Sequence, residues 1–151
     1  MANTQAMCTS FKGELLVGHH NFGTGVIRAA TTIDSFKAAL FLASATINAS
    51  TTAYSTTGEV TGTNYTAGGV AVTFGTAPST SGTTAFVTPS ASITYTNVTL
   101  STAFDCVLLY NSTQSNKAVS VHTFGSQTVT AGTFTLTMPT NDASTGLIRL
   151  A

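Results

Sequence analysis

The most constraining stretch of the sequence is a pair of apolar runs, FDCVLLY at residues 104–110 and AVSVHTF at residues 118–124. The first run is apolar on both faces of a strand, and only Asp105 in it is charged. The seven residues between the runs, NSTQSNK, are polar and typical of a turn. We therefore expect a central hairpin whose first strand is covered on both sides.

Composition limits the classes of function. Charged residues make up 7% of the 151 residues, against about 25% in a typical soluble domain, and the formal net charge is zero. A neutral surface favours a protein that is packed in an assembly, because a solitary protein usually carries charge to stay dispersed. Five lysines and arginines are too few for a basic patch, so we expect no nucleic-acid partner. The length predicts one domain.

Targeting signals and cysteines point to an intracellular origin. No apolar run approaches the roughly 18 residues that span a membrane, so no membrane partner is expected. The N-terminus lacks the pattern of a secretory signal, which predicts folding in a reducing cytoplasm. Cys8 and Cys106 are far apart in the sequence, and Cys106 lies in the most apolar run. This position predicts a buried free thiol.

Most other segments also have the alternation of strands. Segment 92–100 changes phase near Asn97, which predicts a β-bulge. Segment 127–138 is expected to divide into two pieces at the turn Ala131-Gly132. With the central hairpin, the chain has about eight strands separated by Gly, Pro and Ser/Thr turns. We predict an all-β fold, an antiparallel β-sandwich of jelly-roll type. The further strand segments are 36–42, 70–74, 84–88 and 147–151.

Two segments fall outside the strand pattern. Residues 10–17 carry apolar side chains at helical spacing, so we expect a short helix that Gly18 closes. We place an N-terminal arm with this helix at residues 1–25 and a single β-sandwich domain at residues 26–151. Residues 44–69 form a long polar connection with at most a short strand, and loops of this length are usually functional or lie at an interface.

The sequence predicts no catalytic, metal or cofactor site. His19, His20 and His122 match no zinc or calcium signature. A Ser/His/Asp arrangement is defined by geometry, but the chain has no Gly-x-Ser-x-Gly elbow and few acidic residues. We therefore expect no enzymatic activity. Four Asn-x-Ser/Thr triplets follow from the high threonine content and are expected to be unmodified, at residues 48, 64, 97 and 111.

Tyrosines leave one binding function open. Aromatic rings on a β-sandwich can serve as platforms for sugars. The chain has no tryptophan, which weakens the case for a sugar-binding function but does not exclude it. The candidate rings are Tyr54, Tyr65, Tyr95 and Tyr110.

Five stretches are informative when they are considered together. They are MANTQAMCTSFKGELLVGHHNF, SFKAALF, EVTGTNYTAGG, LLYNSTQSNKAVSVHTFG and TAGTFTLTMPTNDASTGLIRLA. In pattern and order, over nearly the whole chain, they resemble small structural proteins encoded by tailed bacteriophages. The resemblance implies a virion component without enzymatic activity.

The charge-poor, β-rich body and the long loops favour a capsid decoration (cement) protein, which bridges neighbouring shell subunits. The expected partner is the major capsid protein, and self-association, as a trimer, is expected as well. The expected location is the virion, after assembly in the host cytoplasm. A tail, neck or fibre component is the alternative, and a glycan-binding host-attachment module is the second alternative. The candidate subunit-contact residues are Phe11, Leu15, Leu16, Phe22, Tyr54 and Tyr65.

Overall fold

The computed structural model describes residues 3–8, 11, 15, 19–20, 22–23, 33–82 and 84–150 of the chain. Within these residues the strands are antiparallel and form two sheets, which confirms the predicted all-β class. The larger sheet has the order β1-β7-β6-β2-β3, and the smaller sheet has the order β4-β5-β8. The strands are β1 (Ala6–Met7), β2 (Phe36–Leu42), β3 (Val70–Val72), β4 (Ser79–Ser81), β5 (Thr84–Val87), β6 (Ile93–Asn111), β7 (Lys117–Leu136) and β8 (Ile148–Leu150).

The predicted hairpin is confirmed and forms the centre of the larger sheet. Its strands β6 and β7 are joined by residues 112–116. The run from Phe104 to Asn111 is buried except for the half-buried Asp105. Both strands are much longer than the apolar runs, at 19 and 20 residues. The segments predicted separately at 92–100 and 127–138 are continuations of these strands, because they pair with each other in the same ladder.

A bulge on β6 confirms the change of phase predicted near Asn97. Tyr95 pairs with Phe134, and Val98 pairs with Gly132. Three steps along β6 therefore oppose two steps along β7, so β6 carries one extra residue. Asn97 has a positive φ of 52°, a left-handed conformation that asparagine tolerates better than most residues.

A second bulge, on β7, compensates the first. Val98 pairs with Gly132, whereas Leu100 pairs with Val129, so three steps on β7 oppose two on β6. The predicted turn at Ala131-Gly132 is therefore wrong. Ala131 has a positive φ of 44° inside a strand that continues past it. Because each strand gains one residue, both keep their apolar side chains on the same side of the sheet.

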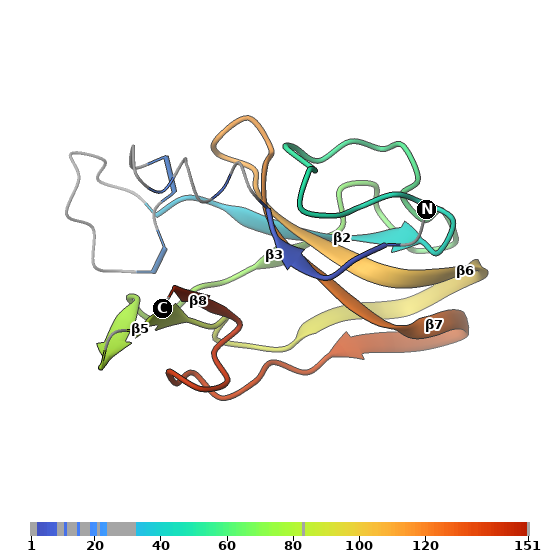
Figure 1. Ribbon diagram of the computed structural model, residues 1–151. Coiled ribbons are helices and arrows are strands. Elements are labelled where there is room, and N and C mark those ends of the chain that lie inside the picture. The colour runs from blue at the N-terminus through green and yellow to red at the C-terminus, as the bar shows by residue number, and fades with distance from the viewer. Residues whose placement is uncertain are drawn as a thin grey trace.

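Further register shifts between positions 100 and 106 bend the hairpin, and its two halves pack against each other (Figure 1). The rings of Phe104 and Phe134 meet edge to face at 5.0 Å. The hydroxyl of Tyr95 donates a hydrogen bond of 2.8 Å to the carbonyl of Ala38 in β2. We call residues 93–100 and 129–136 the distal half of the hairpin, and residues 104–111 and 117–123 the proximal half.

Residues 43–69 lie against the other face of the proximal half, where the long connection runs over β2 and β6 (Figure 1). The ring of Tyr54 stacks on the ring of Tyr110 at 4.6 Å. The short strand expected near Tyr54 is reduced to an isolated bridge between Ala53 and Lys117. This connection is therefore a packed layer of the fold.

The N-terminal residues 3–8 join the sheet and do not stand apart from it. Ala6 of β1 pairs with Val121 of β7. The side chain of Asn3 donates a hydrogen bond to the carbonyl of Leu42. The helix predicted for residues 10–17 lies outside the described residues, apart from two isolated positions.

The smaller sheet lies at the opposite end of the molecule from residues 43–69 (Figure 1). It contains the predicted strands β5 and β8, whose residues Val87 and Ile148 are buried. Strand β4 was not predicted, because its sequence Ser-Thr-Ser has no apolar residue and is typical of a turn. All three of its residues are exposed. It pairs with β5 over its whole length.

Replacement of Phe104 by alanine tests the packing of the two halves. Phe104 is fully buried, so Phe104→Ala leaves a cavity and should lower the free energy of unfolding by about 3–5 kcal/mol. Urea unfolding followed by circular dichroism measures this change. The exposed Thr102 on the same strand provides the control Thr102→Ala, for which we expect a change within about 0.5 kcal/mol. Equal effects of the two variants would contradict the bent packing.

Candidate functional site

The apolar residues predicted as subunit contacts near the N-terminus are buried in the chain's own core. Phe11 and Phe22 have exposed fractions of 0% and 8%. Their rings lie 5.8 Å apart, and Phe22 stacks on Phe36 at 4.8 Å. Leu15 is half-buried against the same core, and Leu16 lies outside the described residues. As they are placed, the described residues of this group stabilise the fold, because burial removes their apolar area from water.

The two tyrosines predicted as contacts hold residues 43–69 against the sheet. The hydroxyls of Tyr54 and Tyr65 donate hydrogen bonds of 2.7 and 2.8 Å to the carboxylate of Glu59. Their rings stack on those of Tyr110 and Tyr95, respectively. Each of the four tyrosines that we considered as sugar platforms therefore has one ring face covered by another ring.

Glu59 anchors the 43–69 loop, a role that its sequence context did not predict. Its carboxylate is buried, with an exposed fraction of 6%, and also accepts a 2.7 Å hydrogen bond from the backbone N–H of Gly68. A buried carboxylate is costly unless it is hydrogen-bonded, and three donors offset that cost. Burial, with a further contribution from Glu59, raises the pKa of Tyr54 and Tyr65. Both hydroxyls therefore stay protonated and keep donating.

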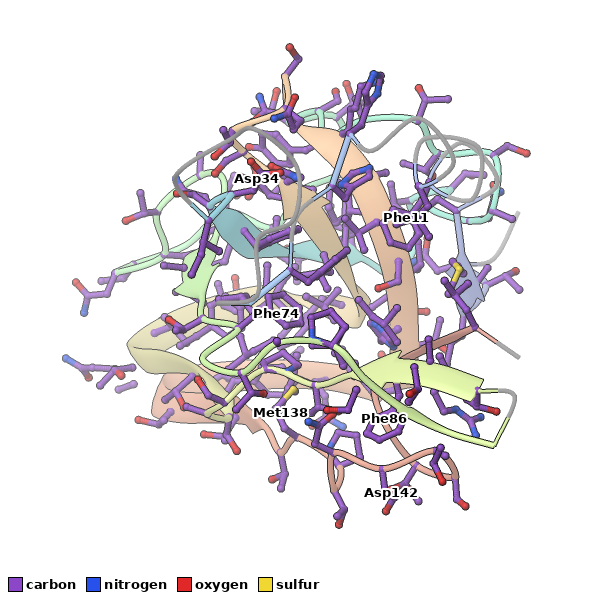
Figure 2. All side chains as sticks on the ribbon, turned by 90° about the vertical axis from the view of Figure 1, so that its left-hand side faces the viewer. Phe11, Asp34, Phe74, Phe86, Met138 and Asp142 are labelled. Atoms are coloured by element: carbon purple, nitrogen blue, oxygen red, sulfur yellow. The ribbon has the colours of Figure 1, made fainter. Side chains whose placement is uncertain are left out.

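A second polar cluster closes the turn between β6 and β7, at the end of the molecule where Asp34 lies (Figure 2). The amide nitrogen of Asn111 donates 2.8 Å to Asp34 and lies 3.2 Å from Nδ1 of His20. The amide oxygen of Asn111 accepts from the backbone N–H groups of Thr113 and Gln114. Asn111 is fully buried, so its Asn-x-Ser/Thr triplet offers no accessible amide in the folded chain.

His122 forms a pair with a serine inside the fold. Its Nε2 lies 2.8 Å from Oγ of Ser120, which is buried. Burial lowers the pKa of His122 to about 4, so the ring is neutral at pH 7. A serine needs access to a substrate as well as a base, and burial denies Ser120 that access. Among the described residues, no group of three or more His, Cys, Asp or Glu side chains could hold a metal ion.

A cavity of about 130 Å³ lies between the two halves of the hairpin. It is lined mainly by apolar side chains, among them Leu109, Phe124 and Leu136, and by His122. Met138, which Figure 2 labels, closes one side of it. A cavity of this size has room for a few waters or a small apolar group.

Both cysteines behave as core residues. Cys8 and Cys106 are both buried, and Cys106 is a free thiol, which confirms the prediction for Cys106. Burial, and then the neighbouring charge of Asp105, raises the pKa of Cys106 to about 12. A thiol with so high a pKa is almost entirely protonated at neutral pH and reacts poorly as a nucleophile.

Few charged side chains are fully exposed among the residues that the structure describes. Among the charged residues that the structure describes, Arg149 alone is exposed. Asp34 and Glu59 are buried, and the remaining described charges are half-buried.

The outer side of the distal half carries exposed threonine side chains on both of its strands. Because the two bulges keep both strands in phase, apolar residues point inward and threonines point outward on each side of the bulges. We call this exposed surface the threonine face. Its residues are Thr94, Thr96, Thr130, Thr133 and Thr135 of the distal half, together with the adjoining Thr128.

Comparison of the chain with known protein families, with curated proteins and with solved structures found no match. No helix in the described part of the chain is long and apolar enough to cross a membrane. The geometry of the site and its surface chemistry therefore carry the functional argument.

Replacement of Glu59 by glutamine tests the anchor of the 43–69 loop. Glutamine keeps the shape but turns one acceptor into a donor that faces other donors, so Glu59→Gln should lower the free energy of unfolding by about 1–3 kcal/mol. Hydrogen exchange at the Gly68 amide, which donates to Glu59, should become faster. The exposed Thr57 in the same loop supplies the control Thr57→Ala. A Gly68 amide as well protected in Glu59→Gln as in the wild type would contradict the anchoring role.

The neutral ring of His122 should make stability depend on pH. Its pKa is lowered from 6.5 to about 4 in the folded chain, so the unfolded chain binds an extra proton between these values. The free energy of unfolding should therefore fall as the pH is lowered through this window, by up to about 3 kcal/mol. His122→Gln removes this contribution, so the difference between the two urea-unfolding profiles isolates it. Parallel profiles of the wild type and the variant would rule out the effect.

Proposed function

We propose that this chain is a structural subunit of a bacteriophage virion that decorates the head as a cement protein. The observation that carries the proposal is the scarcity of charge, because charged residues make up 7% of the chain and its formal net charge is zero. A protein that works alone in solution usually keeps a charged surface to avoid association. The resemblance of the sequence to structural proteins of tailed phages supports the same class.

The threonine face suits burial against another protein. Neutral hydroxyl groups cost less to remove from water than charges do. Short side chains also lose less rotamer entropy on ordering than lysine, arginine or glutamate. The six exposed threonines of this face therefore form a surface that can be covered at low cost.

The 43–69 loop offers a second, pre-organised surface. Glu59 holds it from inside through Tyr54, Tyr65 and Gly68, while residues such as Thr63 remain exposed. A loop that is already ordered loses little entropy when a partner binds it. Loops of this kind suit contacts with neighbouring shell subunits.

The proposal includes the finer features expected from the sequence. The packing of one half of the hairpin over the other supports an antiparallel sandwich of jelly-roll type. The partner is the major capsid protein, and the chain associates with itself. Binding only to the assembled shell would stabilise the shell by mass action.

Copy number in purified particles tests the function. Quantitative mass spectrometry of virions that carry this gene should find the chain in a simple ratio to the major capsid protein, because decoration sites repeat with the lattice of the shell. Particles emptied of DNA should keep it, and tails separated from heads should lack it.

Other results of this experiment would favour one of the two alternative functions. A few copies that remain with isolated tails would contradict head decoration and favour the tail, neck or fibre alternative. A chain that is missing from particles but binds immobilised glycans would contradict the virion role and favour host attachment.

A further inference from the structure

The outer edge of β7 is open along its distal part. Strand β1 pairs with β7 at Ser120 and Val121, and the N–H of Cys8 donates a hydrogen bond to the carbonyl of Val119. From Thr123 to Leu136, no described strand or bridge pairs with the side of β7 that faces away from β6. In Figure 1 this part of β7 runs along the border of the molecule. An open edge presents backbone N–H and C=O groups that can pair with another strand.

This edge lacks the usual side chains that block edge pairing. Natural edges are often protected by charged residues, above all lysine, and by proline. The stretch 123–136 contains no Lys, Arg, Asp, Glu or Pro. The bulge at Ala131 interrupts it, so the regular part of the edge runs from Thr133 to Leu136.

The inward-facing apolar side chains of β7 are less buried than their partners on β6. On β6, Tyr95 and Leu100 are fully enclosed, with exposed fractions of 2% and 0%. Their partners on β7, Phe134 and Val129, are only half-buried. Leu136 is half-buried as well. A half-covered apolar row beside an open edge is the arrangement expected where a further strand adds to a sheet.

We propose that β7 pairs antiparallel with β7 of a second copy of this chain across a two-fold axis. An antiparallel pair of identical strands is self-complementary, and the uncharged stretch meets itself without repulsion. The half-buried apolar side chains of β7 in one copy would lie beside the same side chains of the other copy, and each set would shield the other from water. The end strands β3, β4 and β8 have three residues each. The outer side of β6 also lacks a described strand partner from Ile93 to Val98, but Asn64 donates a hydrogen bond to the carbonyl of Asn97 there, and Thr63 bridges Thr99. The unpaired side of β7 from Thr123 to Leu136 is the longest of these edges.

The mass of the purified chain in solution gives the first test. Light scattering after size exclusion, over a range of concentrations, should give the mass of two chains at the upper end. The inference does not depend on the virion role, so a dimer that is missing from particles would support it and fail only the proposed function. A mass of one chain throughout, or the mass of a trimer, would overturn the inference and leave the virion role standing.

A matched pair of lysine variants locates the contact. Thr135 on the edge strand and Thr94 on β6 are cross-strand partners, and both are exposed on the threonine face. In the dimer, two Thr135→Lys side chains would lie near the axis, whereas two Thr94→Lys side chains would be about 14 Å apart, beyond the Debye length of about 8 Å. Thr135→Lys should weaken dimerisation about tenfold, and Thr94→Lys should change it little. Equal weakening by both variants would contradict the proposed edge.

Charge exchange identifies the partner strand. Thr135→Glu alone should weaken the dimer as Thr135→Lys does, because like charges meet. An equal mixture of the two variants should form heterodimers at least as tight as the wild type, which native mass spectrometry resolves by mass. Homodimers that persist in the mixture, or heterodimers as weak as the homodimers, would show that β7 does not meet β7.

Hydrogen exchange gives a test that needs no variant. In the wild type, amides between Thr133 and Leu136 should exchange more slowly as the protein concentration rises. Amides of the exposed strand β4 serve as the internal control and should not change. Exchange in β7 that is independent of concentration, while the mass shows a dimer, would assign the dimer to another surface and overturn the inference.

Discussion

The packing of the β6–β7 hairpin against itself is the interaction on which the rest of the structure depends. Phe104 and Phe134 meet across the bend, and Tyr95 reaches the backbone of β2 at Ala38. Without the bend, the distal half would be a two-stranded ribbon with its apolar side open to water, and such a hairpin is marginally stable at best. The bend buries both apolar sides at once and leaves the threonines outside.

The 43–69 loop buries its one charged side chain and exposes only neutral ones. A buried carboxylate is placed where two tyrosine hydroxyls and a backbone amide converge on it, at Glu59. The charge thus organises the interior, while the exposed residues of the loop are neutral. A buried carboxylate in a loop whose exposed residues are all neutral is the reverse of the usual placement of charge. This reversal links the fold to the proposed role in an assembly.

The sequence predicted those features of the fold that depend on the pattern of residues within one short segment. The apolar run around Cys106 is a buried strand of the central hairpin, and the change of phase near Asn97 is a β-bulge on β6. The merging of separate runs into two long strands was not predictable, because a bulge at Ala131 carries the same residue types as a turn. The role of Glu59 was also missed, although a single acidic residue in a long neutral loop was a usable signal.

The candidate contact residues show what position in the chain leaves undetermined. Phe11 and Phe22 were predicted as contacts because they lie in the predicted N-terminal arm, but aromatic residues distant in the sequence enclose them. The surface that remains for partners is the threonine face and the edge beside it. The most direct test is hydrogen exchange of the chain in purified particles compared with the free chain. The account predicts slower exchange in particles at residues 94–96 and 133–136, and unchanged exchange across these residues would contradict it.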